Sequence, residues 1–214
     1  MLTSAPATIA VLASGSCTNF ESLAHAARRG ELGGEIALLL CDRSSAPVLE
    51  RARRLGIEAL CLPAGRLRTR LEDESPWLAA LRARGVDTVL LAGFMRRLHA
   101  PMLAAWPDRI LNLHPSLLPA FPGLDAIRRA FEHGVRVTGC TVHLVTEDVD
   151  GGPILAQRAV EVGDGETLDA LETRIHEAEH ALYPPTVRRF LAEPWRREGR
   201  RIVFGAGAAE GAHA

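Results

Sequence analysis

The segment Asn112-Leu113-His114-Pro115 places an amide and an imidazole at a spacing suited to acyl-group chemistry. The residues before it, from Arg109 to Leu113, are mostly apolar and typical of a strand, and prolines and a Pro-Gly turn follow. Side chains two positions apart on a strand point to the same face. Asn112 and His114 are therefore expected to face one cavity, where they could stabilise an oxyanion at an acyl carbon. An isolated Asn-x-His pair, however, is more often a turn cap beside a surface histidine.

A second candidate site is the turn from Ser14 to Asn19, which follows an apolar strand and opens a helix. Backbone N–H groups at a helix N-terminus, with hydroxyls nearby, form a phosphate cradle. The turn lacks the G-x-G-x-x-G pattern, so a nicotinamide cofactor is not favoured. A plain strand-to-helix turn is an equally good interpretation of this segment alone.

Acidic residues downstream could complete either site. Asp150 lies in a Gly-flanked turn, where its carboxylate could orient His114 and stabilise its charge. The alternative is a turn aspartate chosen for local hydrogen bonds. Glu179 and His180 lie late in a long helical stretch, and for them a solvated helix face is the ordinary interpretation.

The elements that must position these residues alternate along the chain. Strands are expected at 8–13, 35–41, 58–62, 86–92 and 109–113, and helices at 19–29, 45–55 and 68–84, the last one interrupted or restarted at Ser75-Pro76. This rhythm predicts an α/β fold with a doubly wound, mostly parallel, twisted, Rossmann-like sheet. A helix at 124–133, antiparallel strands at 138–145 and 153–160, and a long C-terminal helix at 167–191 are expected to follow.

Composition limits the class of protein. The 214 residues suit one domain over 1–204, and the Gly/Ala-rich segment 205–214 is expected to be a disordered tail. With 25 basic and 26 acidic side chains, the net charge of −1 gives no global field that would attract nucleic acid or an anionic membrane. Every basic side chain other than histidine is arginine, which excludes a P-loop ATPase and a Schiff-base enzyme because both need lysine.

Cysteine use and hydropathy indicate the compartment. The four cysteines (Cys17, Cys41, Cys61 and Cys140) are dispersed without a C-x-x-C pair, so neither a disulfide framework nor a zinc site is expected. The N-terminal residues show no signal-peptide pattern, and no apolar run approaches membrane-spanning length. A cytoplasmic protein that works without a metal is expected.

Three segments together resemble the folate-dependent formyltransferases: Asn112 to Pro119, Leu91-Ala-Gly-Phe-Met95-Arg96, and Asp150-Gly-Gly-Pro. The resemblance covers about residues 8–190. Ser14-Gly15-x-x-Thr18-Asn19 and Glu179-His180-Ala-Leu-Tyr183-Pro184 resemble the branch that acts on glycinamide ribonucleotide. From the length, neither the added C-terminal domain of the methionyl-tRNA enzymes nor the N-terminal regulatory domain of the deformylases is expected.

The resemblance implies transfer of the formyl group of the co-substrate 10-formyltetrahydrofolate to the amine of glycinamide ribonucleotide, in purine biosynthesis, through a tetrahedral intermediate. It implies a catalytic trio of Asn112, His114 and Asp150. Ribonucleotide-binding positions would be Gly15, Cys17, Thr18, Asn19 and Glu179. Folate-binding positions would be Arg70, Met95, Arg96, Arg97, Leu98, Asn112, Thr146, Glu147, Asp148, Val149 and Asp150.

Three positions depart from the family pattern, and none belongs to the trio. Cys17 replaces a usual glycine, which questions whether the loop can adopt a positive φ there. Ala120 replaces a frequent lysine, and Arg97 a frequent apolar residue.

Two other functions are compatible with these features. One is a formyltransferase for another small amine, such as an amino sugar. The other is a non-catalytic folate- or nucleotide-binding protein, against which the intact trio argues. The sequence predicts neither a nucleic-acid partner nor a membrane partner, and it leaves a homodimer open.

Overall fold

The computed structural model describes residues 6–67 and 69–205. The contacts of the chain group it into two compact units, one ending at Leu111 and the other beginning at Asn112. Each unit is described by itself below. Most of the segment expected to be a disordered tail, residues 206–214, lies outside the described residues, and the single domain expected over 1–204 stays a prediction.

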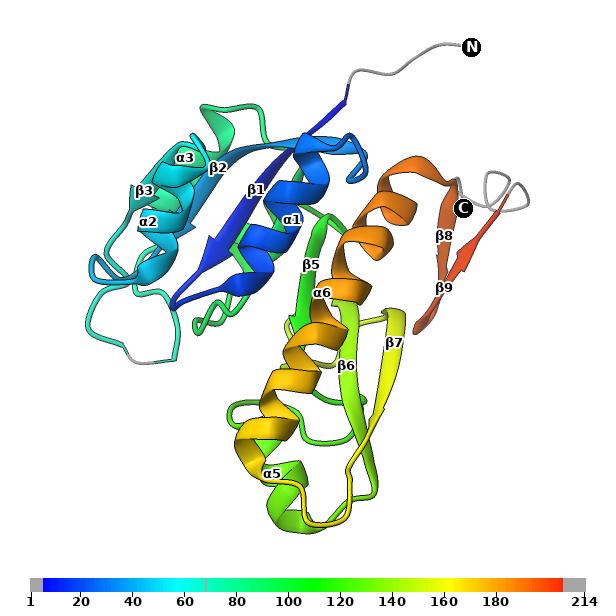
Figure 1. Cartoon of the computed structure of the whole chain (residues 1–214). Helices are drawn as coiled ribbons and strands as arrows, with labels where there is room; N and C mark the ends of the chain where they lie inside the picture. The colour runs from blue at the N-terminus through cyan, green and yellow to red at the C-terminus, as the bar shows by residue number, and fades with distance from the viewer. Residues whose placement is uncertain (1–5, 68, 206–214) are drawn as a thin grey trace. The chain divides into compact units, whose positions relative to one another are not determined.

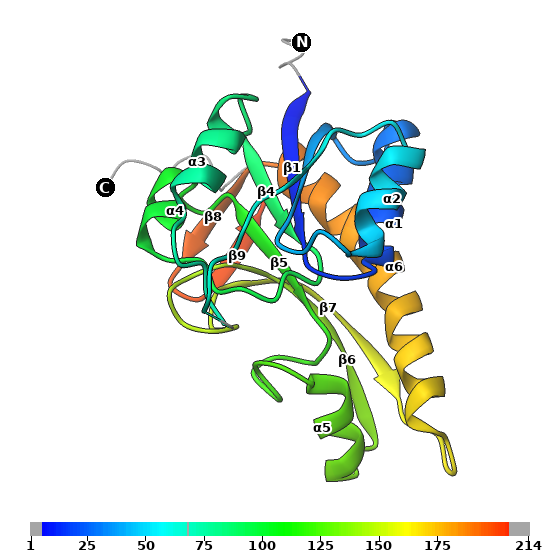
Figure 2. The same cartoon turned by 90° about the vertical axis from the view of Figure 1, so that its left-hand side faces the viewer.

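The first unit is a parallel sheet with helices on both sides. Its strand order is β3-β2-β1-β4, and the pairs β1–β2, β1–β4 and β2–β3 are all parallel. Figure 2 shows α1 and α2 on one side of β1 and β4, with α3 and α4 on the other. The elements are β1 (Ala7–Ala13), α1 (Thr18–Arg28), β2 (Gly34–Cys41), α2 (Pro47–Arg54), β3 (Ala59–Cys61), α3 (Ser75–Arg82), β4 (Thr88–Leu91) and α4 (Ala100–Ala105).

The strands of this unit form where continuous apolar segments can be buried in its core. Ile9 to Ala13 and Leu38 to Cys41 are fully buried, as continuous apolar runs are in parallel sheets covered on both faces. The strand β5 (Ile110–His114) begins in this unit and ends in the second.

The second unit combines an antiparallel pair with a long helix (Figure 1). β6 and β7 pair in antiparallel fashion, β9 runs parallel to β7 where Ile154 faces Arg201, and β8 and β9 form an antiparallel hairpin. α6 packs on β6 and β7 through buried residues that include Leu171, Ile175 and Tyr183. The elements are α5 (Ala126–His133), β6 (Val137–Leu144), β7 (Ile154–Glu161), α6 (Leu168–Ala192), β8 (Trp195–Glu198) and β9 (Arg201–Phe204).

The predicted fold class is confirmed: the sheet is mostly parallel, with antiparallel C-terminal strands and a long C-terminal helix. One expectation was wrong in part. The helical stretch predicted over 68–84 does restart at Ser75-Pro76, where Pro76 supplies a helix start, but it forms only from Ser75 to Arg82, and the described residues before Ser75 are not helical. Among the residues that the structure describes, no helix is long and apolar enough to cross a membrane.

Candidate functional site

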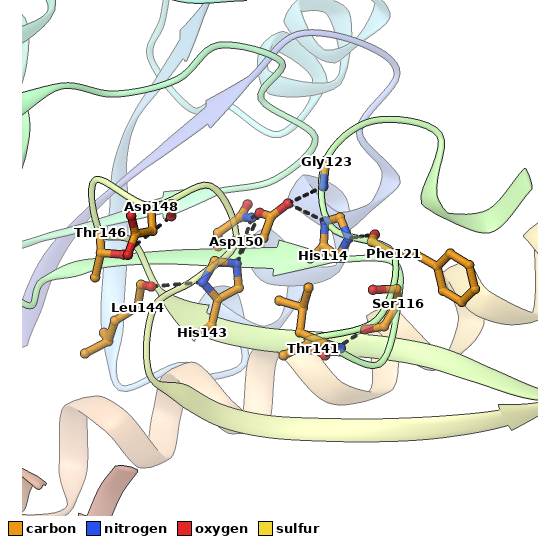
Figure 3. Close-up of polar contacts among 12 residues, drawn as sticks. His114, Ser116, Phe121, Gly123, Thr141, His143, Leu144, Thr146, Asp148 and Asp150 are labelled. Carbon is orange, nitrogen blue, oxygen red and sulfur yellow. Dashed lines mark hydrogen bonds and ion pairs between the residues drawn. The ribbon is translucent and has the colours of Figure 1, made fainter. Parts of the chain in front are cut away.

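The three residues expected to be catalytic lie together in the second unit. Asn112 and His114 come from β5, and Asp150 from the turn between β6 and β7. The Asp150 carboxylate accepts from Asn112 Nδ2 at 3.4 Å through Oδ1, and its Oδ2 lies 3.4 Å from His114 Nδ1. Figure 3 shows Asp150 between two imidazoles, those of His114 and His143.

Both ring nitrogens of His114 face acceptors. Nδ1 faces Asp150, and Nε2 donates to the carbonyl of Phe121 at 2.9 Å. The ring is buried, with a residue exposure of 5%. A ring with a proton on each nitrogen can donate to both acceptors at once. If an oxyanion takes the place of one of these acceptors, the ring N–H that faced it can donate to the oxyanion instead.

Asp150 is held as a carboxylate by its surroundings. Burial opposes its ionisation, but contact with His143, the N–H of Gly123 at 2.7 Å and the nearby charge of His114 together hold the pKa of Asp150 below its ordinary value. Its backbone has φ 51, in the left-handed region that aspartate tolerates better than most residues. The group is therefore a fixed negative charge in the neutral pH range.

The turn that carries Asp150 needs its glycines. A Cβ on Gly152 would lie 1.8 Å from the carbonyl oxygen of Leu144, too close for any other residue without a backbone shift. Thr146 donates from Oγ1 to the carbonyl of Asp148 at 3.4 Å, and Gly151 N donates to that same carbonyl at 3.1 Å. Residues 146–149, expected to contact folate, thus form one turn with Asp150.

His143 is a site residue that the sequence analysis did not select. It is 2% exposed, and its Nδ1 donates to the carbonyl of Leu144 at 2.9 Å. Its Nε2 lies 3.1 Å from Asn112 Nδ2 and 3.6 Å from Asp150 Oδ1. The one signal in the sequence was a histidine at the end of an apolar strand, directly before the Asp150 turn.

A buried hydrogen-bond network holds the loop between His114 and Gly123 on β6 and β7. Thr141 Oγ1 donates to the carbonyl of Ser116 at 2.7 Å and accepts from Leu118 N at 3.1 Å. Gln157 Nε2 donates both to Thr141 Oγ1 at 3.0 Å and to the carbonyl of Leu118 at 2.9 Å. The loop therefore presents the Phe121 carbonyl and the Gly123 N–H to the site on a fixed frame.

The expected phosphate loop lies in the first unit, where α1 begins. Cys17 precedes the helix with φ 47 and ψ 66, so the loop does adopt a positive φ at this cysteine. Its Sγ lies 2.9 Å from the carbonyl of Ala92, to which the thiol donates. Thr18 and Asn19 begin the helix, and a Cβ on Gly15 would meet only open space.

The first unit also gathers Arg70 and the segment from Met95 to Leu98. Arg70 and Arg97 form an isolated parallel bridge, and Arg97 N donates to the carbonyl of Thr69 at 2.9 Å. The Arg96 guanidinium contacts Asp42 at 2.7 Å and the carbonyl of Leu67 at 2.5 Å. Met95 is half exposed and Leu98 is buried. Arg96 thus positions the segment, and its charge is already paired.

Glu179 is buried in α6, so the ordinary interpretation of a solvated helix face was wrong for it. Its carboxylate lies 2.8 Å from His176 Nδ1, and this hydrogen bond, against the effect of burial, raises the pKa of His176. Burial, with the charge of Glu179 as the next cause, raises the pKa of Cys140 on β6 to about 12.

The residues that the structure describes contain no group of three or more His, Cys, Asp or Glu side chains arranged to hold a metal ion. The expectation of catalysis without a metal stays a prediction.

The chain is similar to known proteins over most of its length. A family profile described as formyl transferase matches residues 7–187. The phosphoribosylglycinamide formyltransferase of Bacillus subtilis is 41% identical over 182 residues, which cover 85% of this chain and 93% of that protein. The human trifunctional purine biosynthetic protein adenosine-3 is 39% identical, and the match covers 85% of this chain and 18% of that longer protein.

Solved structures of related proteins are similar to this chain as well. Glycinamide ribonucleotide transformylase 1 from Symbiobacterium toebii superposes with a TM-score of 0.88 at 48% identity, covering 92% of this chain and 93% of that one. A formyltetrahydrofolate deformylase from Pseudomonas syringae has a TM-score of 0.83 at 22% identity, covering 94% of this chain and 66% of that one. At that identity the deformylase shows only a shared fold.

Proposed function

The chain belongs to the formyl transferase family, and from this premise we propose that it transfers a formyl group from 10-formyltetrahydrofolate to the amine of glycinamide ribonucleotide. This activity is the one named for the relatives that align with nearly the whole chain. The observation that carries the proposal is the cluster of Asn112, His114 and Asp150, whose polar atoms approach one another within 3.4 Å. Binding alone requires no such cluster.

In the proposed reaction, the uncharged amine of the ribonucleotide attacks the formyl carbon. A carbon–nitrogen bond forms, and the formyl oxygen becomes an oxyanion. Asn112 Nδ2 and a ring N–H of His114 donate to this oxyanion. The tetrahedral intermediate then collapses, the bond to the folate nitrogen breaks, and that nitrogen receives the proton that the amine has lost.

Asp150 supplies the charge that this sequence of steps needs. As a fixed carboxylate facing His114 Nδ1, it orients the ring and stabilises the ring when it carries a positive charge. It is also placed to relay the proton from the attacking amine to the departing folate nitrogen through a water molecule. The reaction needs no covalent intermediate on the protein.

Two sets of residues would hold the substrates. We assign the ribonucleotide to the loop of Gly15, Cys17, Thr18 and Asn19 and to Glu179, because backbone N–H groups at the start of α1 suit a phosphate. We assign the folate to Arg70, the segment 95–98, Asn112 and the turn 146–150. Because Arg96 is paired with Asp42, its contribution would come from its backbone.

The experiment is incubation of the pure protein with 10-formyltetrahydrofolate and a panel of amines that contains glycinamide ribonucleotide, amino sugars and glycine. The proposal predicts tetrahydrofolate release only with the ribonucleotide, in equal amount to N-formylated product. Formylation of an amino sugar instead would reassign the loop at 14–19. Binding of both ligands without turnover would indicate a non-catalytic protein.

A further inference from the structure

The loop expected to hold the ribonucleotide phosphate and the segment expected to hold folate are joined by side chains within the first unit. Ser14 and Cys17 belong to the loop after β1, and residues 92–95 form the turn after β4 that leads into the folate segment. β1 and β4 are parallel neighbours, so the two turns leave the same edge of the sheet. That the two turns are neighbours therefore follows from the fold, whereas two of the three hydrogen bonds between them depend on particular side chains.

Three hydrogen bonds connect the two turns. Ser14 N donates to the carbonyl of Gly93 at 3.1 Å, and Met95 N donates to Ser14 Oγ at 2.9 Å. The thiol of Cys17 donates to the carbonyl of Ala92 at 2.9 Å. Ser14 is 2% exposed. Water therefore cannot replace Met95 N as the hydrogen-bond partner of the Ser14 hydroxyl unless the turn opens.

The same loop has a second, separate attachment to α2. Arg51 Nε donates to the carbonyl of Ser16 at 2.8 Å, and Val48 N donates to the carbonyl of Gly15 at 3.2 Å. These bonds hold the loop without touching residues 92–95. The chain thus offers one set of contacts that links the two segments and another that only anchors the loop.

We propose that Ser14, assisted by Cys17, is a positioning residue that couples the binding of the two substrates. This inference rests on the proposed function, because it takes the ribonucleotide to bind the loop and the folate to bind the segment from Met95. A ligand that orders one turn also orders the other through the Ser14 hydroxyl and the Cys17 thiol. The first substrate then bears the entropy cost of ordering both turns, and the second binds more tightly.

The test measures both affinities in a dead-end pair. Tetrahydrofolate has no formyl group to transfer, so its complex with glycinamide ribonucleotide does not turn over. Calorimetric Kd values are measured for each ligand alone and with the other saturating. In the native chain we expect each ligand to lower the Kd of the other by the same factor, about 5-fold or more, because coupling between two sites is reciprocal.

The variants distinguish the contacts that link the two turns from the contacts that only anchor the loop on α2. In Ser14→Ala, which loses the acceptor for Met95 N, the coupling factor should fall below about 2-fold, and in Cys17→Ala it should be intermediate. In Arg51→Gln, the matched control, ribonucleotide affinity should weaken while the coupling factor stays at the native value. If Ser14→Ala does not fold, as judged by circular dichroism and its urea midpoint, the coupling factor of Cys17→Ala is compared with that of Arg51→Gln. The inference then predicts a lower factor in Cys17→Ala.

A native coupling factor near 1 with both ligands bound would overturn the inference and leave the proposed function intact. So would a native factor retained in both Ser14→Ala and Cys17→Ala, or one lost equally in Arg51→Gln. Failure of the native chain to bind the ribonucleotide or tetrahydrofolate alone would instead count against the proposed function.

Discussion

Asp150 is the residue on which the other site side chains converge. Asn112 and His143 approach its Oδ1, and His114 and the Gly123 N–H approach its Oδ2. The N–H groups of Asn112 and Gly123 donate to the carboxylate, and together with the two nearby imidazoles they compensate for the burial of a negative charge. The chemistry assigned to His114 depends on this arrangement.

Replacement of His114 by alanine should remove transition-state stabilisation while both substrates still bind. Loss of one oxyanion donor lowers turnover on the order of 100-fold or more. Steady-state kcat, with separate Kd measurements for the two substrates, checks this. The control is His25→Ala, an exposed histidine of α1, which should keep the native rate. Near-native turnover by His114→Ala would remove His114 from the mechanism.

Replacement of Asp150 by asparagine should change how stability depends on pH. The pKa of Asp150 is lower in the folded protein than its unfolded value of about 3.9, so its ionised form stabilises the fold above that pH. This stabilisation is lost as the pH falls through the depressed folded pKa. The difference in unfolding free energy between native chain and variant should therefore shrink from pH 5 downward. Urea titrations across pH 2–7 measure it, and a difference independent of pH would contradict the assignment.

The sequence predicted that Asn112, His114 and Asp150 lie together, and the structure places them so. This prediction was possible because the alternation of side chains along a strand and a recognisable motif both depend on short segments. The sequence did not identify His143, whose role depends on β6 bringing it within 3.1 Å of Asn112, 31 positions away in the chain. Nor did it predict the Phe121 carbonyl and Gly123 N–H, since backbone groups leave no mark in residue types. The burial of Glu179 was also missed, because it depends on which face α6 packs on β6.

At the scale of elements, the turn between β6 and β7 decides where Asp150 points. Leu144 N donates to the carbonyl of Pro153 at 2.9 Å, which closes the turn, and Gly152 passes against the Leu144 carbonyl. A register shift between Val142 and His143 accompanies this closure. The turn therefore has little room to rearrange without moving both Asp150 and His143.

We expect Gly152→Ala to lower both stability and turnover. Its Cβ would overlap the Leu144 carbonyl, and overpacking of this kind costs about 1–3 kcal/mol. The matched control is Gly163→Ala, in the turn after β7, where a Cβ would lie 3.6 Å from its nearest neighbour and should be tolerated. Thermal midpoints and kcat of both variants test this. Equal thermal midpoints and equal kcat values for the two variants would show that the close approach of Gly152 to the Leu144 carbonyl is not needed for stability or turnover.

Most elements followed from apolar runs and turn residues, with ends shifted by at most two residues. The exception, the helix expected before Ser75, fails for a tertiary reason: Arg70 and Thr69 pair with Arg97 instead of forming helical bonds. The short helix α4 and the hairpin of β8 and β9 were not expected. Both depend on contacts with residues outside the element, which a local pattern does not reveal: Trp195 of β8 stacks on Phe190 of α6, and Met102 N of α4 donates to the Glu74 carboxylate.

At the scale of the whole molecule, the β-α rhythm was sufficient to predict the fold class, because a parallel sheet needs crossover helices on its faces. The grouping of the chain into units that meet in sequence at Leu111 and Asn112 was not predicted, since β5 itself spans the boundary. The reaction could be assigned because motifs in both units occur together. Composition alone does not point to a reaction. Together the motifs indicate that one chain transfers a formyl group directly between two substrates.

The most direct test follows the formyl carbon itself. 10-Formyltetrahydrofolate labelled with ¹³C in the formyl group is mixed with the native chain and excess glycinamide ribonucleotide, and the products are observed by NMR. We predict that the label appears in the N-formyl group of the ribonucleotide in equal amount to the tetrahydrofolate released, and that no labelled formate forms. Label recovered as formate would show hydrolysis of the folate instead of transfer and would contradict the proposed function.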